Sequence, residues 1–228
     1  MKIKIGSKFT YKSGSLYTFI NPFSFYILTL QKNAGQIFEN FILHPDGISI
    51  AKLLALLCGK VKRVSFDDTS IAPEVFSLIN KENLTLGMLG SSKESIENAS
   101  QIIGKKYDIN NITVHDGYFS PLEAPRVLEG FLNCDVVICS MGTPQQENML
   151  INLRNLGWQG TGFTCGGYFD QLSSTSGNSY YPELINKFHL RWAYRIYKEP
   201  RRLWRRYLFD YPKGIFALLR KIELISII

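Results

Sequence analysis

The chain has 228 residues, of which 45% are hydrophobic, and this length and composition suit one globular domain or one domain with an appendage. It contains no run of about 18 apolar residues that could span a bilayer, and Met1 to Lys4 lack the apolar core of a secretory signal. The four cysteines have neither metal-binding nor redox spacing, and the three histidines are far apart, so we expect reduced thiols and no zinc site.

Short apolar segments alternate with helix-length segments along most of the chain. The predicted strands are Leu16–Ile20, Val61–Phe66, Leu84–Leu89, Ile112–His115, Asp135–Ser140 and Gly160–Thr164. The predicted helices are Pro22–Lys32, Ile48–Cys58, Ile71–Asn80, Lys93–Tyr107, Pro121–Phe131 and Pro144–Asn155. This alternation predicts an α/β fold with a Rossmann-like parallel sheet flanked by helices.

The strand signal stops after about Gly177, and Pro200 and Pro212 break the helical remainder into pieces. We therefore predict a Rossmann-like domain over residues 1–180 and a basic, aromatic, helical appendage over residues 181–228. Within the domain, ligands of such sheets bind at the carboxyl ends of the strands, beside helix N-termini.

Two of the predicted strands end in turns that permit a ligand. The Leu84 strand runs into Gly90, and a turn of this kind can hold phosphate on free backbone N–H groups. The glycine pattern is not that of a dinucleotide-binding turn, so a tight βα turn explains it equally well. After His115, either Tyr118 or Phe119 stacks on a base or sugar, or both rings pack in the core beside a turn.

Amide and carboxyl side chains follow the last two predicted strands. Gln145 and Gln146 lie in the first turn of the Pro144 helix, where amides can read a uracil or a sugar hydroxyl, although Thr143 and Gln146 also fit a capping box. Gly167 lets a ligand approach the backbone, and Asp170 can accept a hydrogen bond from ribose or uracil. A glycine-rich turn without a ligand is the alternative.

A single aspartate is the candidate general base. Asp46 lies between Pro45 and Gly47, in a stiff turn at a strand end, where it acts either as a base or, more commonly for such residues, as a turn or N-cap aspartate. Asp67 and Asp68 are adjacent, but neighbouring side chains on an extended chain point apart, which favours capping over metal binding. The chain contains no Asp-x-Asp motif.

Most of the positive charge lies near the end of the chain. Eleven Lys or Arg between Lys187 and Lys221, against two acids, give this segment a net charge of +9, whereas the whole chain has +7. Arginines bind phosphates in bidentate fashion, and rings beside cations suit the headgroup level of a bilayer, although basic segments with stacking rings also hold RNA. A solvated helix face explains the charge but not seven interleaved rings that we expect to be exposed. These rings are Trp192, Tyr194, Tyr197, Trp204, Tyr207, Phe209 and Tyr211.

Taken together, these residues resemble the WecG/TagA/CpsF family of bacterial glycosyltransferases. The ordered set of motifs is specific and covers roughly residues 17 to 206. The matching stretches are Asn21-Pro22, Pro45-Asp46-Gly47, Arg63-Val64-Ser65 with Asp68, Leu89-Gly90, Asp116-Gly117-Tyr118-Phe119, Met141 to Glu147, Gly166 to Asp170, and Trp192 to Arg195 running to Glu199-Pro200-Arg201.

The resemblance implies a Rossmann-like GT-E fold with a membrane-targeting C-terminal appendage. It implies inverting transfer from a UDP-sugar to a polyprenyl-diphosphate-linked acceptor in surface polysaccharide synthesis, with Asp46 as catalytic base. It carries the uridine contacts to Gln146, Asp170 and Tyr118, and the diphosphate contacts to arginines of the appendage. The substrate-binding residues that we predict are Asn21, Gly90, Tyr118, Gln145, Gln146, Gly167, Asp170, Arg195, Arg202 and Arg205.

Without an Asp-x-Asp motif, we expect a metal-independent enzyme with no cofactor, in which helix N-termini and appendage arginines stabilise the departing UDP. We expect the active site to be complete only when the appendage docks over the domain. The predicted partners are the UDP-sugar, the lipid-linked acceptor and an anionic membrane surface, but no nucleic acid, at the inner face of the cell membrane. The sequence leaves homo-oligomer formation and the donor sugar open.

A second hypothesis belongs to another class. A non-catalytic, membrane- or RNA-tethered nucleotide-binding protein would keep the Rossmann-like domain and the basic appendage. In such a protein Asp46 would be dispensable, so its substitution separates the two hypotheses.

Overall fold

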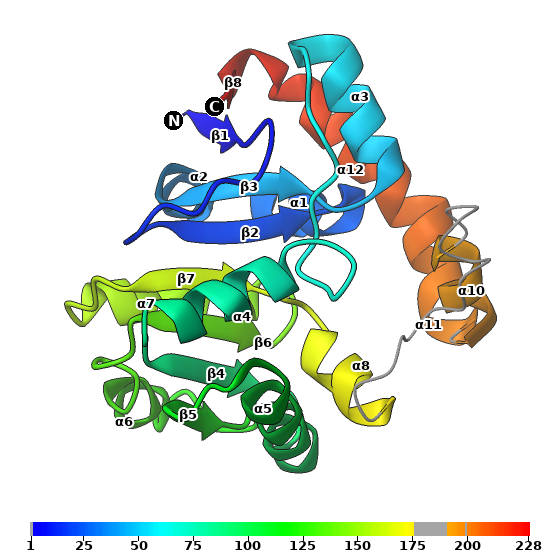
Figure 1. Ribbon diagram of the computed structural model, residues 1–228. Helices are drawn as coiled ribbons and strands as arrows, with labels where there is room; N and C mark the ends of the chain where they lie inside the picture. The colour runs from blue at the N-terminus through cyan, green and yellow to red at the C-terminus, as the bar shows by residue number, and fades with distance from the viewer. Residues whose placement is uncertain (1, 176–190, 199) are drawn as a thin grey trace.

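An all-parallel sheet of eight strands forms the centre of the protein (Figure 1). The computed structural model describes residues 2–175, 191–198 and 200–228. The strand order is β5-β4-β6-β7-β2-β3-β1-β8. The strands are β1 (Ile3–Ile5), β2 (Leu16–Ile20), β3 (Phe41–Pro45), β4 (Leu86–Gly90), β5 (Ile112–His115), β6 (Val136–Ser140), β7 (Thr161–Thr164) and β8 (Ile225–Ile227). The predicted α/β fold is therefore confirmed.

Helices cover both faces of this sheet. Alternate residues of β6 enter two separate core clusters, Val137 and Cys139 in one and Val136 and Ile138 in the other. Every residue of β6 is buried, which explains why the strand is apolar up to its last residue, Ser140. The helices before the tail are α1 (Pro22–Thr29), α2 (Ala34–Asn40), α3 (Ile48–Cys58), α4 (Ala72–Lys81), α5 (Lys93–Tyr107), α6 (Ala124–Glu129), α7 (Gln145–Asn155) and α8 (Tyr168–Ser174).

The first third of the chain differs from the sequence-based prediction in four elements: β1, α2 and β3 were not predicted, and the predicted strand over residues 61–66 is absent. Residues 61–66 form no strand: Lys62 and Val64 donate single backbone hydrogen bonds, to Ser7 and to Pro45, but no ladder forms. Their apolar side chains are buried by packing, and burial alone produces the same pattern as a strand. The strand β3, which the sequence analysis did not predict, ends in a histidine and a proline.

The end of the chain supplies a further correction. β8 pairs in parallel with β1 from Ile3–Ile225 to Ile5–Ile227, so the expectation that no strand follows Gly177 is wrong. Both termini lie together at this edge of the sheet (Figure 1). The described elements of the tail are α10 (Arg191–Lys198), α11 (Pro200–Arg205), a π-helical turn η1 (Arg206–Asp210), α12 (Tyr211–Arg220), a 3₁₀ turn η2 (Ile222–Leu224) and β8.

The last helix packs tightly on the first. Leu218 of α12 is buried in the same core cluster as Phe25 of α1. Gly214 approaches Pro22 so closely that a Cβ atom there would collide with the Pro22 backbone. The final elements of the predicted appendage therefore pack on the body. The predicted boundary near residue 180 lies outside the described residues and stays a prediction.

Candidate active site

A large cleft lies at the carboxyl ends of the strands, where the sequence predicts ligand binding. Its volume is about 1500 Å³, and its walls come from the segments that follow β2, β3, β4, β5, β6 and β7, together with η1 and the start of α12. The lining includes the predicted site residues Asn21, Asp46, Tyr118, Gln145, Gln146, Gly167 and Asp170. Residues that are far apart in the sequence thus meet at one sheet edge.

Strand register places Asp46 in this cleft. Ile20 of β2 lies opposite Pro45 of β3, so Asn21 and Asp46 leave neighbouring strands side by side. The Asp46 amide donates a hydrogen bond of 2.7 Å to the Ile20 carbonyl, which holds the turn to the sheet. Gly47 then has a φ of +137°, a conformation that favours glycine, and α3 begins at the next residue. The Asp46 side chain keeps 39% of its surface accessible.

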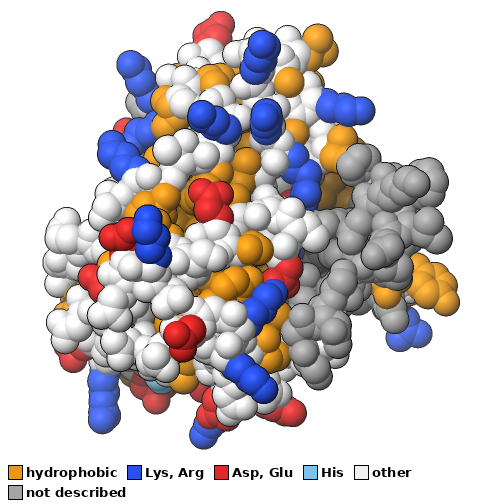
Figure 2. Space-filling model, in the orientation of Figure 1, with side chains coloured by type: hydrophobic (Ala, Val, Ile, Leu, Met, Phe, Trp, Pro, Cys, Tyr) orange, Lys and Arg blue, Asp and Glu red, His pale blue; other side chains and the backbone are white. Residues whose placement is uncertain are grey.

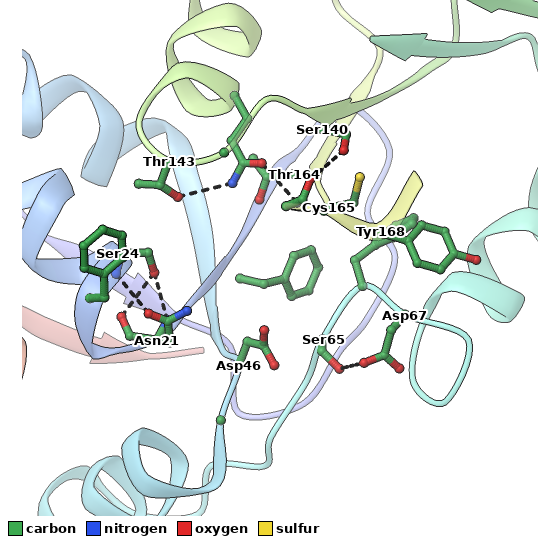
Figure 3. A pocket seen from close by; sticks show the side chains of 18 of the residues that line it. Asn21, Ser24, Asp46, Ser65, Asp67, Ser140, Thr143, Thr164, Cys165 and Tyr168 are labelled. Atoms are coloured by element: carbon green, nitrogen blue, oxygen red, sulfur yellow. Dashed lines mark hydrogen bonds between the residues drawn. The ribbon is translucent and has the colours of Figure 1, made fainter. Parts of the chain in front are cut away.

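An arginine that sequence reasoning gave no role lies beside Asp46. Arg63 Nη2 is 3.3 Å from Asp46 Oδ1, 2.7 Å from Ser65 Oγ and 3.4 Å from Asp67 Oδ2. Ser65 Oγ also donates to Asp67 at 2.7 Å, and Figure 3 shows Asp46 near this Ser65–Asp67 pair. One guanidinium therefore connects two carboxylates that are far apart in sequence. The only sequence signal was the place of Arg63 in the family motif.

The adjacent aspartates point apart, as predicted. Asp67 Oδ1 accepts hydrogen bonds from the amide and hydroxyl of Thr69 within the turn before α4. Asp68 instead contacts Lys106 at 3.2 Å and the Tyr168 hydroxyl at 3.2 Å. Among the residues that the structure describes, no cluster of three His, Cys, Asp or Glu could hold a metal ion. Metal independence of the activity stays a prediction.

Asn21 caps α1 at the edge of the cleft. Its Oδ1 accepts a hydrogen bond of 3.0 Å from the Ser24 amide, and Ser24 Oγ accepts one of 2.9 Å from the Asn21 amide. This reciprocal capping box is drawn in Figure 3. Asn21 therefore fixes the start of the helix that forms this wall. It also lines the cleft, and its contact with substrate stays a prediction.

The two glutamines at the start of α7 have different environments. Gln146 is 3% exposed: its Oε1 accepts from the Gly166 amide at 3.1 Å, and its Nε2 donates to Thr143 at 3.3 Å and to Glu147 at 3.2 Å. Gln146 thus holds the α7 turn to the turn after β7, and its carbonyl oxygen keeps one further acceptor position. Gln145 is exposed. The predicted capping box is wrong, because the helix begins after Pro144.

A buried carboxyl group, that of Glu147, lies next to Gln146 and accepts a hydrogen bond from it. Glu147 is fully buried, and its Oε1 accepts hydrogen bonds from Thr18 at 2.7 Å and from Thr143 at 3.2 Å. Burial raises the pKa of Glu147. Thr164, which lines the cleft, donates to Thr18 at 3.0 Å, so the network ties the strand ends of β2 and β7 to α7. Sequence reasoning gave Glu147 no role.

The remaining predicted ligand residues fall into two groups. Tyr118 is 81% exposed and lines the cleft, so the core-packing alternative is wrong for its ring, whereas Phe119 packs against the core. Gly167 and Asp170 are exposed at the start of α8 and line the cleft. Gly90 lies outside the lining. Its φ of +122° and its close approach to the Ser140 backbone give it a packing reason instead.

In the tail, Arg206 lines the cleft, whereas the predicted Arg205 does not. Arg206 lines the cleft with its guanidinium 3.7 Å from the Phe23 ring centre, whereas Arg205 is exposed outside the lining. The side chains of Arg195 and Arg202 lie outside the described part of the structure. Which arginine contacts a diphosphate stays a prediction.

The rings of the tail divide between the cleft and the surface. Tyr207 and Tyr211 line the cleft, and their ring centres are 4.5 Å apart. Burial raises the pKa of Tyr211, with Tyr207 and the Asp46 carboxylate as further causes. The expectation of an exposed ring is therefore wrong for these two tyrosines. It is confirmed for Tyr197, Trp204 and Phe209.

Comparison with known proteins relates this chain to a family of enzymes. A family model described as "Glycosyl transferase WecG/TagA/CpsF family" matches residues 4–225. A UDP-Gal:alpha-D-GlcNAc-diphosphoundecaprenol beta-1,4-galactosyltransferase from Shigella boydii is 37% identical over 208 residues, which are 89% of this chain and 84% of that protein. An N-acetylglucosaminyldiphosphoundecaprenol N-acetyl-beta-D-mannosaminyltransferase from Bacillus spizizenii is 28% identical over 184 residues, which are 79% of this chain and 68% of that protein.

Proposed function

This chain belongs to the WecG/TagA/CpsF family of glycosyltransferases, and we propose that it moves a sugar from a UDP-sugar to a polyprenyl-diphosphate-linked acceptor with inversion. The names of both relatives specify an acceptor on diphosphoundecaprenol and a β-linked product. A β product is what inversion of an α-linked sugar nucleotide gives. One name also specifies UDP-Gal as donor.

The observation that carries the proposal is the position of Asp46. Its accessible carboxylate lines the same cleft as Asp170 and Arg206. In the proposed reaction, the Asp46 carboxylate accepts the proton of the acceptor hydroxyl while that oxygen bonds to the anomeric carbon. The bond between that carbon and the UDP oxygen breaks, and the electron pair leaves with UDP.

The nucleotide fits the polar side of the cleft. Asp170 and the Gln146 carbonyl can accept hydrogen bonds from ribose or uracil, and the exposed Tyr118 ring offers a stacking surface. Gly167 leaves room for close approach of the ligand to the backbone. The predicted uridine contacts thus lie on the segments that follow β5, β6 and β7.

Leaving-group stabilisation is assigned to positive charge rather than to a metal. Arg206 brings a guanidinium to the cleft, and the N-terminus of α7 adds partial positive charge at the Gln145 end. The wall formed by Arg206, Tyr207 and Tyr211 agrees with a site that the tail completes. We therefore propose catalysis without a metal ion or cofactor.

The acceptor places the reaction at a membrane. None of the described helices is long and apolar enough to cross a bilayer. The exposed Tyr197, Trp204 and Phe209, with Arg201 and Arg205 nearby, suit peripheral binding to anionic lipid. We propose that the enzyme binds the inner face of the cell membrane and contributes to bacterial surface polysaccharide.

A donor screen tests the function directly. UDP-sugars are incubated with the protein and a lipid-linked N-acetylglucosamine acceptor, with and without a chelator, and product mass and anomeric configuration are measured. We expect one donor to give a β-linked product with release of UDP. The Asp108→Asn variant, altered outside the cleft at a left-handed position that asparagine tolerates, serves as the matched control for Asp46→Asn. Absence of transfer from every donor would refute the proposal.

A further inference from the structure

One face of α3 runs from the cleft to the protein surface. Ser49 and Lys52, near the start of the helix, line the cleft. Leu56 continues the same face at helical spacing and is 82% exposed, and the adjacent Leu57 is 44% exposed. Ser49 and Leu56 are separated by seven residues, or about 10 Å along the helix axis. A strongly exposed leucine pair thus lies one short helix away from Asp46.

The segment that contains these leucines carries only basic charge. From Ile48 to Phe66 the chain contains Lys52, Lys60, Lys62 and Arg63 and no acidic residue. Lys52, Lys60 and Lys62 are exposed. Figure 2 shows basic and hydrophobic side chains over the upper part of the molecule, where α3 lies in Figure 1, with an acidic side chain at the top edge. Exposed leucines surrounded by lysines complement the apolar and anionic layers of a lipid surface.

A second helix begins at the same cleft and has a similar face. Tyr211, the first residue of α12, lines the cleft, and Phe216 and Leu219 farther along are 57% and 41% exposed. Lys213 and Arg220 on this helix are exposed as well. Leu53 of α3 and Leu218 of α12 belong to one core cluster, so both helices pack on the same side of the sheet.

We propose that α3 is a membrane-contacting element of the catalytic domain, in which Leu56 and Leu57 enter the headgroup region of an anionic bilayer and Lys60 and Lys62 contact lipid phosphates. The inference rests on the proposed function, because a lipid-linked acceptor must present its diphosphate at that surface. The cleft end of α3 then receives the acceptor while the far end rests on lipid. The contact extends beyond the aromatic tail to the body of the protein.

Vesicle co-sedimentation with full-length protein tests this assignment. The variants are Leu56→Gln/Leu57→Gln and Lys60→Gln/Lys62→Gln, measured with phosphatidylglycerol and with phosphatidylcholine vesicles. The matched controls are Leu122→Gln, where the wild-type leucine is 93% exposed near α6, and Lys93→Gln/Lys105→Gln on α5. All altered residues are exposed, so thermal denaturation should be unchanged.

We expect the leucine variant to bind phosphatidylglycerol vesicles about tenfold more weakly than wild type. The lysine variant should lose about fivefold for each lysine, or about 25-fold in total, because each basic residue near an anionic surface contributes about 1 kcal/mol. Neither control should change binding. Wild-type affinity in either α3 variant, or an equal loss in its control, would overturn the inference.

The two proposals fail in different ways. If wild-type protein binds vesicles through α3 but transfers no sugar from any donor, the proposed function is wrong and the membrane contact stands. If the α3 variants transfer sugar normally to a short-chain, water-soluble acceptor but poorly to the same acceptor in vesicles, both proposals are supported. Equal transfer to both acceptors by the α3 variants would overturn the membrane contact alone.

Discussion

Arg63 lies 3.3 Å from the Asp46 carboxylate and 3.4 Å from that of Asp67, so one cation is shared by two acids. A neighbouring cation favours the ionised form of a carboxylate, which is the form that a general base needs. The pair is partly exposed, with 29% of the Arg63 side chain and 39% of the Asp46 side chain accessible, so water weakens the interaction. Arg63 is thus a positioning residue whose effect should be visible in the pH dependence of turnover.

Arg63→Gln should move the acid limb of the pH–rate profile to higher pH, because the neutral amide no longer favours the ionised carboxylate of Asp46. Turnover at neutral pH should fall as well, because the amide no longer holds Asp46 and Asp67 together. Lys106→Gln is the control, since Lys106 pairs with Asp68, which lies outside the cleft lining. A profile that keeps its position while thermal stability falls would show that Arg63 has only a structural role.

Asp46→Asn should lower kcat by about 100- to 10,000-fold while the protein remains folded and still binds UDP. The reason is that asparagine has a similar shape but cannot accept a proton at neutral pH. Turnover, UDP affinity by calorimetry and thermal denaturation are measured on the same preparation. Wild-type turnover would rule out the base and favour the non-catalytic hypothesis.

Arg206→Gln should reduce kcat/KM for the donor at least about tenfold, since Arg206 lines the cleft where the diphosphate charge develops. Arg205→Gln is the matched control, because its exposed side chain lies outside the lining. These two substitutions test the tail better than a truncation would, because a truncation would also remove α12 and β8, which pack on the body. Greater impairment of the Arg205 variant would reverse the assignment.

His44 should make the fold sensitive to acid. It is buried against the rings of Tyr17 and Phe19, and burial lowers its pKa to about 4 from 6.5. Above pH 6.5 the imidazole is neutral in both states. Between pH 6.5 and 4 the unfolded chain binds a proton that the folded chain excludes, so stability falls by about 1.4 kcal/mol for each pH unit.

His44→Phe should remove this part of the acid destabilisation, because a phenyl ring fits among the same aromatic neighbours without a titratable group. Urea denaturation of both proteins at pH 7, 5.5 and 4.5 measures the difference. His115→Gln, at the half-buried end of β5, is the control and should leave the wild-type pH dependence in place. Parallel pH curves for wild type and His44→Phe would contradict the prediction.

Gly214→Ala should destabilise the protein by about 1–3 kcal/mol, because the added methyl group meets the Pro22 backbone and forces α12 away from α1. The melting temperature should fall by several degrees. Gly35→Ala is the control: no atom lies within 4 Å of a Cβ placed there, in helix α2, so this change should be neutral or stabilising. Equal melting temperatures for the two variants would show that the close contact is not rigid.

Much of the fold could be predicted from local patterns. The buried strands β4 and β6 are almost entirely apolar, and a proline or a capping residue marks many helix starts, so the α/β order was readable. Asp46 stood out because Pro45 restricts the backbone on one side of it and Gly47 permits an unusual backbone angle on the other. The neighbourhood of Asp46 was not readable, because Arg63 is 17 residues away and reaches Asp46 only through the path of the 59–66 segment.

The sequence by itself determined the α/β class, the candidate base and the cationic, aromatic character of the tail, because these depend on residue type and short-range spacing. Tertiary structure alone decided that β8 adds an edge strand beside β1 and that Gln146 is buried against Gly166. It also decided that Arg206 rather than Arg205 lines the cleft. Neighbouring residues on a helix point in directions about 100° apart, so the face that meets the cleft depends on how the tail packs on the body. That packing follows from contacts such as Gly214 with Pro22, which no local pattern contains.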